Sequence, residues 1–185
     1  LDADKMILAS NELRNATMQA QLSDRKLTIT EARGNSFGGS LGLRGIFETR
    51  EGEKPRMDFH YDMSGILYKQ IFDALESFRQ LAPLAEYITG KFNLDLEFSG
   101  LINEDLSIDL NSIQAQGFLK TVNAYIESFP AINTLSDKFD LGGLKDGYQL
   151  NNTKNWLQIR DGKVYIEEFE RELGGLNYRI KGTHS

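Results

Sequence analysis

Apolar and polar residues alternate strictly along several stretches, and this period of two constrains the fold more than any other feature. Successive side chains of a strand point to opposite faces, so the alternation predicts strands with one apolar and one solvated face. Antiparallel sheets show this pattern, whereas buried parallel strands are apolar on both faces. The apolar positions of the two longest stretches are Met57, Phe59, Tyr61, Met63, Phe92, Leu94, Leu96 and Phe98. Shorter stretches place Leu27, Ile29, Ile108, Leu110, Val164 and Ile166 in the same way.

Polar segments rich in turn-forming residues separate these stretches. They cover residues 23–26, 49–55, 102–105 and 160–163. We therefore expect hairpins near residues 20–25, 100–106 and 160–163. Asp161-Gly162 gives the strongest signal, because this dipeptide suits the positive φ angles of a type I′ turn.

Residues 65–90 break the alternation and predict a helix over Ile66–Tyr87. The apolar residues Leu67, Ile71, Leu75, Phe78 and Ala82 have helical spacing, Ser64 is placed for an N-cap, and Gly90 closes the segment. Pro83 is expected to kink this helix or to begin a second short one. A further short helix is expected within Ser128–Asp140, beginning near Pro130. Residues 142–156 are expected to begin as a loop, with a strand by Trp156–Ile159.

Two distant segments, RKLTITEARGNSFGGSLGLRG (25–45) and GKVYIEEFERELGGLNYRIKG (162–182), share one pattern of strand, short bend and strand. Lys26 aligns with Lys163, Ile29 with Ile166 and Gly45 with Gly182, if one extra residue follows the second glycine pair. Glycine loses backbone freedom on folding and packs no side chain, so paired glycines between apolar residues need a structural reason. We expect the repeated unit to bend a ribbon of hairpins around its apolar side. The residues assigned to these bends are Gly38, Gly39, Gly174 and Gly175.

These patterns predict an α+β protein: a curved, mainly antiparallel β-sheet of amphipathic hairpin repeats with one or two helices packed on its apolar face. The 185 residues are expected to form a single domain over 1–185. Its sub-units would be an N-terminal hairpin repeat (1–64), a helical insertion (65–90) and C-terminal strands (91–185). The acidic opening LDADKMILAS and the ending GTHS indicate a fragment of a longer chain.

Composition excludes several classes of function. The net charge is −6, and no run of Lys or Arg offers the clustered basic surface that nucleic-acid binding needs. The absence of cysteine excludes disulfides, thiol nucleophiles and thiolate metal sites. No stretch approaches the roughly 20 apolar residues of a membrane helix. P-loop, dinucleotide-binding and nucleophile-elbow motifs are also missing.

Two groups of polar residues are candidates for a metal site or a catalytic site. Asp58, His60 and Asp62 share one strand face and offer metal-binding atoms, but a solvated strand face explains them better. Four acidic residues near the C-terminus are too close in sequence to provide the separated carboxylates of a glycosidase; they are Glu167, Glu168, Glu170 and Glu172. We therefore expect no enzyme, no catalytic residue, no metal and no cofactor.

The segment WLQIRDGKVYIEEFERELGGLNYRIKG, with its I-x-D-G-x-V core at Ile159, Asp161, Gly162 and Val164, resembles the C-terminal domain of the AsmA-like family. ATMQAQLSDRKLTITEARGNSFGGSLGLRG is similar to the family's upstream repeat. The resemblance covers most of the chain and is weakest over 64–90. It implies a periplasmic domain, tethered to the inner membrane by a segment absent here, that supports outer-membrane assembly and lipid homeostasis or transport. The partners it implies are phospholipid acyl chains, neighbouring domains of the same longer chain and other envelope proteins.

On this interpretation the apolar stripe is the lipid-contacting surface, formed by Met57, Phe59, Tyr61, Met63, Phe92, Leu94, Leu96 and Phe98. The helix at 66–87 is the obvious internal cover for that surface, and the sequence leaves open whether the face is plugged or exposed. The alternative is a structural or adhesive β-sandwich that binds protein or glycan through its polar face or loops. A sandwich would bury the apolar face between two sheets and would have no use for the helix.

Overall fold

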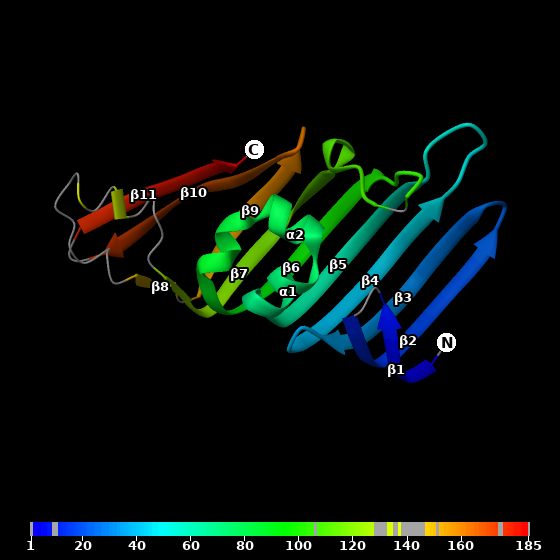
Figure 1. Ribbon diagram of the computed structural model, residues 1–185, viewed down its shortest axis with the longest axis horizontal. Coiled ribbons are helices and arrows are strands. Elements are labelled where there is room, and N and C mark those ends of the chain that lie inside the picture. The colour runs from blue at the N-terminus through cyan, green and yellow to red at the C-terminus, as the bar shows by residue number, and fades with distance from the viewer. Residues whose placement is uncertain are drawn as a thin grey trace.

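The computed structural model describes residues 2–8, 11–105, 107–127, 133–134, 137, 147–150, 152–173 and 176–184. Within these residues, eleven strands form one antiparallel sheet, in which neighbours along the chain are mostly neighbours in space (Figure 1). The order is β1-β2-β3-β4-β5-β6-β7-β9-β10-β11, and β8 pairs with the end of β7. The strands are β1 (Asp2–Leu8), β2 (Asn11–Ser23), β3 (Lys26–Ser36), β4 (Gly39–Glu48), β5 (Arg56–Leu67), β6 (Ile88–Leu101), β7 (Gln114–Ile126), β8 (Tyr148–Leu150), β9 (Thr153–Arg160), β10 (Lys163–Leu173) and β11 (Leu176–His184).

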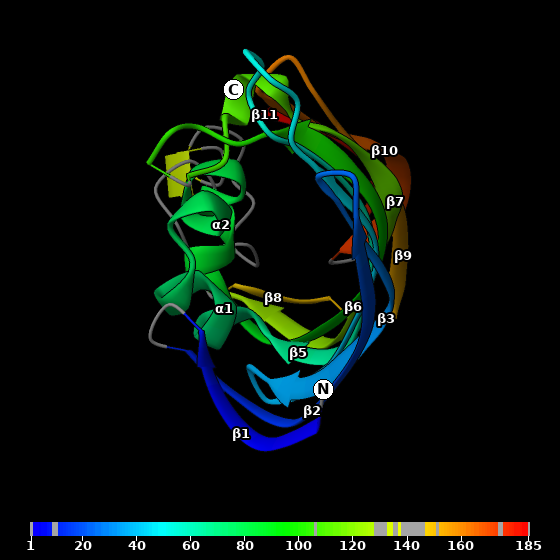
Figure 2. The ribbon, with the colours of Figure 1, turned by 90° about the vertical axis from the view of Figure 1, so that its right-hand side faces the viewer.

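The sheet is curled, and the helical segment lies on its concave side. Figure 2 shows the strands bending in an open arc with the helices α1 (Tyr68–Ala74) and α2 (Glu76–Leu81) across the opening. A short 3₁₀ helix, η1 (Pro83–Tyr87), leads from α2 into β6. The described strands belong to one sheet, so they do not form the two packed sheets of a β-sandwich. None of the described helices has the length and apolar character needed to cross a membrane.

Two of the predicted hairpins are confirmed as two-residue turns. Strands β9 and β10 are joined by Asp161 and Gly162, with φ angles of 53° and 67°. Strands β2 and β3 are joined by Asp24 and Arg25, with φ angles of 49° and 63°. Positive φ at both central residues is the geometry of a type I′ turn, whose twist matches that of the strands it connects.

The third predicted hairpin is correct only at its tip. Ile102 and Ile108 form an isolated antiparallel bridge, so the chain does reverse near residues 102–108. Leu110, however, begins the 3₁₀ helix η2 (Leu110–Ser112) instead of continuing a strand. The reason is local: the Asp109 side chain accepts a hydrogen bond from the backbone N–H of Asn111 and caps this turn.

The two copies of the sequence repeat form equivalent hairpins, β3–β4 and β10–β11. Ile29 pairs with Gly45 in the first hairpin, and Ile166 pairs with Gly182 in the second. In each, the register shifts immediately after that pair, which is the mark of a β-bulge. The two hairpins match without the expected extra residue. The strands of the first end in the pair Ser36 and Gly39, and those of the second end in the equivalent pair Leu173 and Leu176.

The first glycine doublet forms a turn and a close strand contact. Phe37 and Gly38, with φ angles of 52° and 79°, form the two-residue connection between β3 and β4. A side chain on Gly39, the first residue of β4, would lie 2.2 Å from the backbone oxygen of Ser64 on β5. The bend expected at this doublet is therefore a reversal of the chain, and the kink within the hairpin lies at the bulge beside Gly45. Gly174 and Gly175 lie outside the described residues.

The predicted helix over Ile66–Tyr87 is present as three short segments. Strand β5 continues through Ser64 to Leu67, so Ser64 is not the N-cap, and Gly90 lies inside β6 instead of ending a helix. The chain is extended at Leu75, between α1 and α2. Pro83 begins the separate segment η1, as expected. The prediction fails at Ser64 because Ile66 pairs with Phe92 on β6, and this pairing extends the strand.

The remaining expectations concern the segment before β9. Most of the short helix predicted within Ser128–Asp140 lies outside the described residues. The strand expected at Trp156–Ile159 is confirmed as part of β9. Strand β7, which the sequence analysis did not identify, fills the place between β6 and β9 in the sheet.

Candidate functional site

Strand register separates the two faces of the sheet into apolar and polar surfaces. Two rows of directly paired residues cross seven strands from β3 to β10, and neither contains a charged residue. The first is Ile29, Gly45, Phe59, Phe98, Ala115, Ile159 and Val164. The second is Ala32, Leu43, Tyr61, Leu96, Gly117, Leu157 and Ile166. We call these the inner rows and their side of the sheet the inner face, because residues of the helical segment pack against it.

The structure brings together all eight residues predicted to contact lipid. They share the inner face of β5 and β6, where Phe59 pairs with Phe98, Tyr61 with Leu96 and Met63 with Leu94. Met57 and Phe92 are 4% and 1% exposed, and Leu96 and Phe98 are also buried. The half-buried members are Phe59, Tyr61, Met63 and Leu94. The stripe is therefore part core and part accessible surface.

The helical segment buries one end of the inner face. Ile66, Tyr68, Ile71 and Phe92 belong to one buried cluster, against which Phe78 of α2 also packs. The Tyr68 ring lies 4.6 Å from the Phe92 ring between centroids, and the Phe78 ring stacks on Phe92 at 6.3 Å. The Tyr68 hydroxyl is 3.1 Å from the Thr121 hydroxyl on β7, and burial raises the pKa of Tyr68 to about 12.

The aromatic residues beyond this cover form a second contact group. Phe59 and Tyr61 meet edge to face at 6.2 Å, and Tyr61 meets Phe98 in the same way at 5.8 Å. Burial raises the pKa of Tyr61. Within the part of the chain that the structure describes, no hydrogen bond to the Tyr61 hydroxyl is present. Tyr61 therefore places a polar group on an otherwise apolar surface.

Sequence reasoning identified Ile29, Val164 and Ile166 as apolar strand positions but missed the inner-face residues of β4 and β7. Leu41 and Phe47 on β4 pack against the two buried clusters, as does Leu119 on β7. Their signal was weak because glycine and alanine interrupt the alternation at Gly45, Ala115 and Gly117. Only the register shows that these small residues continue the apolar rows.

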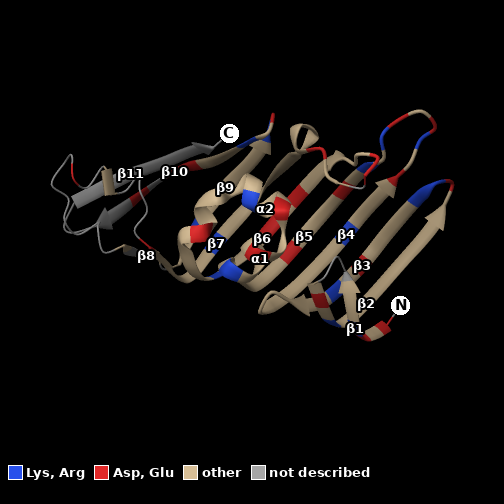
Figure 3. Ribbon diagram, viewed as in Figure 1, with Lys and Arg blue, Asp and Glu red and all other residues tan. Residues whose placement is uncertain are grey.

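The opposite face is polar, and it carries the three residues that the sequence offered as possible metal ligands. Asp58, His60 and Asp62 share this face, as predicted from their spacing. His60 Nε2 lies 3.6 Å from Asp95 Oδ2 on the neighbouring strand. Figure 3 shows Asp and Glu recurring along β5 and β6. The described residues nevertheless include no group of three His, Cys, Asp or Glu placed to hold a metal ion.

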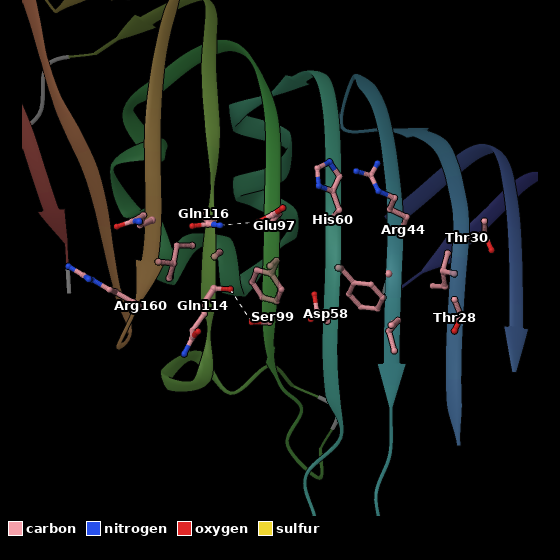
Figure 4. Close-up of a pocket in the computed structure, with 18 of the residues that line it drawn as sticks. Thr28, Thr30, Arg44, Asp58, His60, Glu97, Ser99, Gln114, Gln116 and Arg160 are labelled. Carbon is pink, nitrogen blue, oxygen red and sulfur yellow. Dashed lines mark hydrogen bonds between the residues drawn. The ribbon is translucent and has the colours of Figure 1, made fainter. Parts of the chain in front are cut away.

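A trough of about 1130 Å³ runs across the strands on this polar face. Its two walls are rows of outward side chains, and its floor is the backbone of the first inner row (Figure 4). We call the walls the His60 row (Thr30, Arg44, His60, Glu97, Gln116 and Gln158) and the Asp58 row (Thr28, Ile46, Asp58, Ser99, Gln114 and Arg160). Sequence reasoning did not foresee this trough, because its members come from strands far apart in the chain.

The carboxylates considered as glycosidase residues lie away from the trough. Glu167, Glu168 and Glu170 belong to β10, near one edge of the sheet. The side chain of Glu172 lies outside the description. Glu167, Glu168 and Glu170 do not line the trough.

No family model matches the chain, and no curated protein or solved structure matches it.

Proposed function

We propose that the inner face of this sheet contacts the acyl chains of phospholipid, and that the chain is a non-enzymatic segment of an AsmA-like envelope protein. In that role it supports outer-membrane assembly and lipid homeostasis or transport. The observation that carries the proposal is the pair of inner rows, which cross seven strands without a charged residue.

The dimensions of the inner rows suit acyl chains. Seven strands at the usual spacing of about 4.8 Å give a surface roughly 29 Å long. That length is on the scale of the hydrocarbon core of a bilayer, about 30 Å, which two acyl chains span end to end. Each methylene group moved from water onto such a surface contributes about 0.8 kcal/mol. Six members of the rows are already buried, namely Ile29, Leu96, Phe98, Ala115, Leu157 and Ile159. An acyl chain therefore gains affinity where it covers the half-buried members, such as Phe59 and Tyr61.

The partial cover by the helical segment also fits this role. Ile66, Phe92 and Ala124 are buried in one cluster with Tyr68 and Ile71 of α1, whereas Phe59, Tyr61, Met63 and Leu94 stay half-buried. A fully covered face would leave no place for a ligand, and a bare face would expose a large apolar patch to water. A face covered at one end keeps an accessible apolar surface of limited size.

The edges of the sheet support a place within a longer assembly. Within the described residues, β1 and β11 each pair with one strand only, and they lie at opposite ends of the sheet (Figure 1). Unpaired strand edges readily accept further strands. We propose that neighbouring domains of the same longer chain extend the sheet there. We further propose that the domain is periplasmic and is tethered to the inner membrane through another segment of that chain.

The experiment compares two variants that add the same charge to opposite faces of β5. Met63→Glu places a carboxylate on the inner face, and Ser64→Glu places one on the exposed outer face. Delipidated protein is incubated with vesicles of phosphatidylethanolamine and phosphatidylglycerol, and bound lipid is counted by native mass spectrometry. We expect lipid on the parent protein and on Ser64→Glu, and little on Met63→Glu, because burying an acyl chain against a carboxylate is unfavourable.

Absence of bound phospholipid from the parent protein contradicts the proposal. Equal binding by both variants also contradicts it, because the lipid would then lie away from the inner face. Circular dichroism of each variant confirms that the sheet has formed before binding is measured.

A further inference from the structure

The polar trough has the properties of a binding site that the proposed lipid role does not use. It lies on the face of the sheet opposite the inner rows, so an occupant of one face does not compete with an occupant of the other. Its two walls have parallel rows of side chains about 7 Å apart, because residues two apart along a strand are separated by that distance. Across six strands the trough is roughly 24 Å long at the usual strand spacing.

The walls carry hydrogen-bonding groups that the protein itself leaves unused. Gln116 Nε2 donates to Glu97 Oε2 at 2.9 Å, which links two neighbouring members of the His60 row. The side chains of Arg44, Gln114 and Gln158 form no hydrogen bond or ion pair within the part of the chain described here. Amides and guanidinium groups are planar, and an amide offers a donor and an acceptor side by side. Vicinal hydroxyl groups, which each donate and accept, match such groups.

The charges of the trough nearly cancel. Its lining includes two arginines, Arg44 and Arg160, and three carboxylates, Asp58, Glu97 and Asp161. This near-balance disfavours a strongly anionic polymer, which would meet carboxylates along both walls. It equally disfavours a polycation, which would meet the arginines. A neutral, hydroxyl-rich ligand satisfies both kinds of group through hydrogen bonds.

Aromatic rings border the trough on the same face. Phe118 pairs with Trp156 in the row next to the His60 row, and their rings meet edge to face at 4.8 Å. Phe118 is 40% exposed although it is aromatic. Lys154 Nζ lies over the Phe118 ring at 4.1 Å, and the Arg160 guanidinium lies over the Tyr165 ring at 4.7 Å. Aromatic rings beside planar polar groups suit the alternating apolar and hydroxyl-bearing surfaces of a sugar ring.

The spacing of polar side chains along the trough favours a saccharide over a peptide as the ligand. Polar side chains recur along the His60 row once per strand, about every 4.8 Å, and along the Asp58 row in the same way except at Ile46. An extended peptide presents side chains to one side about every 7 Å, which does not match that repeat. Sugar units joined in an extended chain repeat on a scale close to the strand spacing. We propose that the trough binds a neutral oligosaccharide lying across the strands, with its hydroxyl groups held by the Gln and Arg side chains of the two walls.

The test uses nuclear magnetic resonance of the full ¹⁵N-labelled chain. The probes are tetrasaccharides of β-1,4-linked glucose and of β-1,4-linked N-acetylglucosamine. Trp156 is the single tryptophan, so its indole N–H gives an unambiguous signal at the border of the trough. The side-chain amides of Gln114, Gln116 and Gln158 report on the walls. We expect saturable shifts of these signals with at least one probe.

Variants locate the binding. Replacing Gln116 and Gln158 together by Ala removes two pairs of hydrogen-bonding groups and is expected to weaken binding roughly tenfold or more. Gln19→Ala, an exposed residue on β2 outside the trough, is the matched control and is expected to bind as the parent does. Met63→Glu on the inner face is also expected to leave saccharide binding unchanged, which separates this proposal from the lipid proposal.

Two results would overturn the inference. One is the absence of any shift with both probes at millimolar concentration. The other is binding of an extended neutral peptide that shifts the same amide signals when neither saccharide does.

Discussion

Gly45 is the residue on which the bulge of the first hairpin depends, and replacing it with alanine should strongly destabilise the sheet. Its φ angle is +146°, a backbone conformation that residues with a side chain rarely adopt. An alanine Cβ at this position would lie 2.2 Å from the backbone oxygen of Asp58 and 2.6 Å from Phe59 Cδ1. Both belong to β5, which pairs with β4 along this segment. The methyl group would therefore force the two strands apart.

The expected loss combines two effects. Holding a non-glycine residue in so unfavourable a conformation costs of order 1–3 kcal/mol. Moving β5 away from β4 weakens at least one backbone hydrogen bond of the ladder, at about 1 kcal/mol. We expect Gly45→Ala to lower the free energy of unfolding by about 2–4 kcal/mol, a large fraction of the roughly 5–15 kcal/mol typical of a whole protein.

The measurement is urea unfolding followed by circular dichroism, with Gly42→Ala as the matched control. Gly42 lies on the same strand, its nearest neighbours would be 3.4 Å from an added Cβ, and its φ angle is not positive. Its replacement should change stability by no more than about 1 kcal/mol, because alanine is no worse than glycine in an ordinary strand. If the two variants unfold within 1 kcal/mol of each other, the reasoning about the bulge is wrong.

Three further predictions concern the turn, the buried hydroxyl pair and the surface charges. Arg25→Gly should raise the free energy of unfolding by up to about 1 kcal/mol in the same assay, because Arg25 has a φ angle of 63° that glycine adopts without strain. Tyr68→Phe should lower the free energy of unfolding by about 1–2 kcal/mol because it leaves the buried Thr121 hydroxyl without its partner. In a double-mutant cycle, Thr121→Val should cost less stability in the Tyr68→Phe background than in the parent protein, which would show that the two hydroxyl groups are coupled. The Lys54 ammonium lowers the pKa of Asp109 below its usual value of 3.8, so this pair stabilises the fold above that pH and the contribution is lost as the pH falls through the lowered pKa. Lys54→Met should therefore reduce the difference in melting temperature between neutral and acid pH, and an unchanged difference would show that the pair does not contribute.

The alternation of the sequence was sufficient to predict the faces of β5 and β6. Every second residue from Met57 to Met63 lies on the inner face, and so does every second residue from Phe92 to Phe98. Local chemistry was also enough for the turn at Asp161 and Gly162. These features depend on residues close together in the chain, so the sequence contains the whole signal for them.

The boundary between β5 and the helical segment could not be predicted in this way. Ser64 is a good capping residue, and the stripe from Leu67 onward has helical spacing. The deciding interaction is the pairing of Ile66 with Phe92, a partner more than twenty residues away that is itself buried at 1% exposure. A tertiary contact of this kind outweighs a local capping preference.

Strand β7 was missed because, apart from Leu119, its inward residues are mostly small or polar. Ala115, Gly117 and Thr121 face the inner side, while Phe118 faces outward. The hydropathy of the strand therefore does not alternate clearly, although its side chains point alternately to the two faces of the sheet. The polar trough depends on β7 and on five other strands at once, so it became visible only when the register of the whole sheet was known.

Lipid contact along the inner face can be tested most sharply by a photo-crosslinking scan along β5. A photoreactive amino acid is placed in turn at Phe59, His60, Tyr61, Asp62 and Met63, and each variant is irradiated with vesicles of phosphatidylethanolamine and phosphatidylglycerol. We expect adducts of phospholipid at Phe59, Tyr61 and Met63, and few or none at His60 and Asp62. Crosslinking without this alternation, or none at the three inner positions, would contradict this expectation.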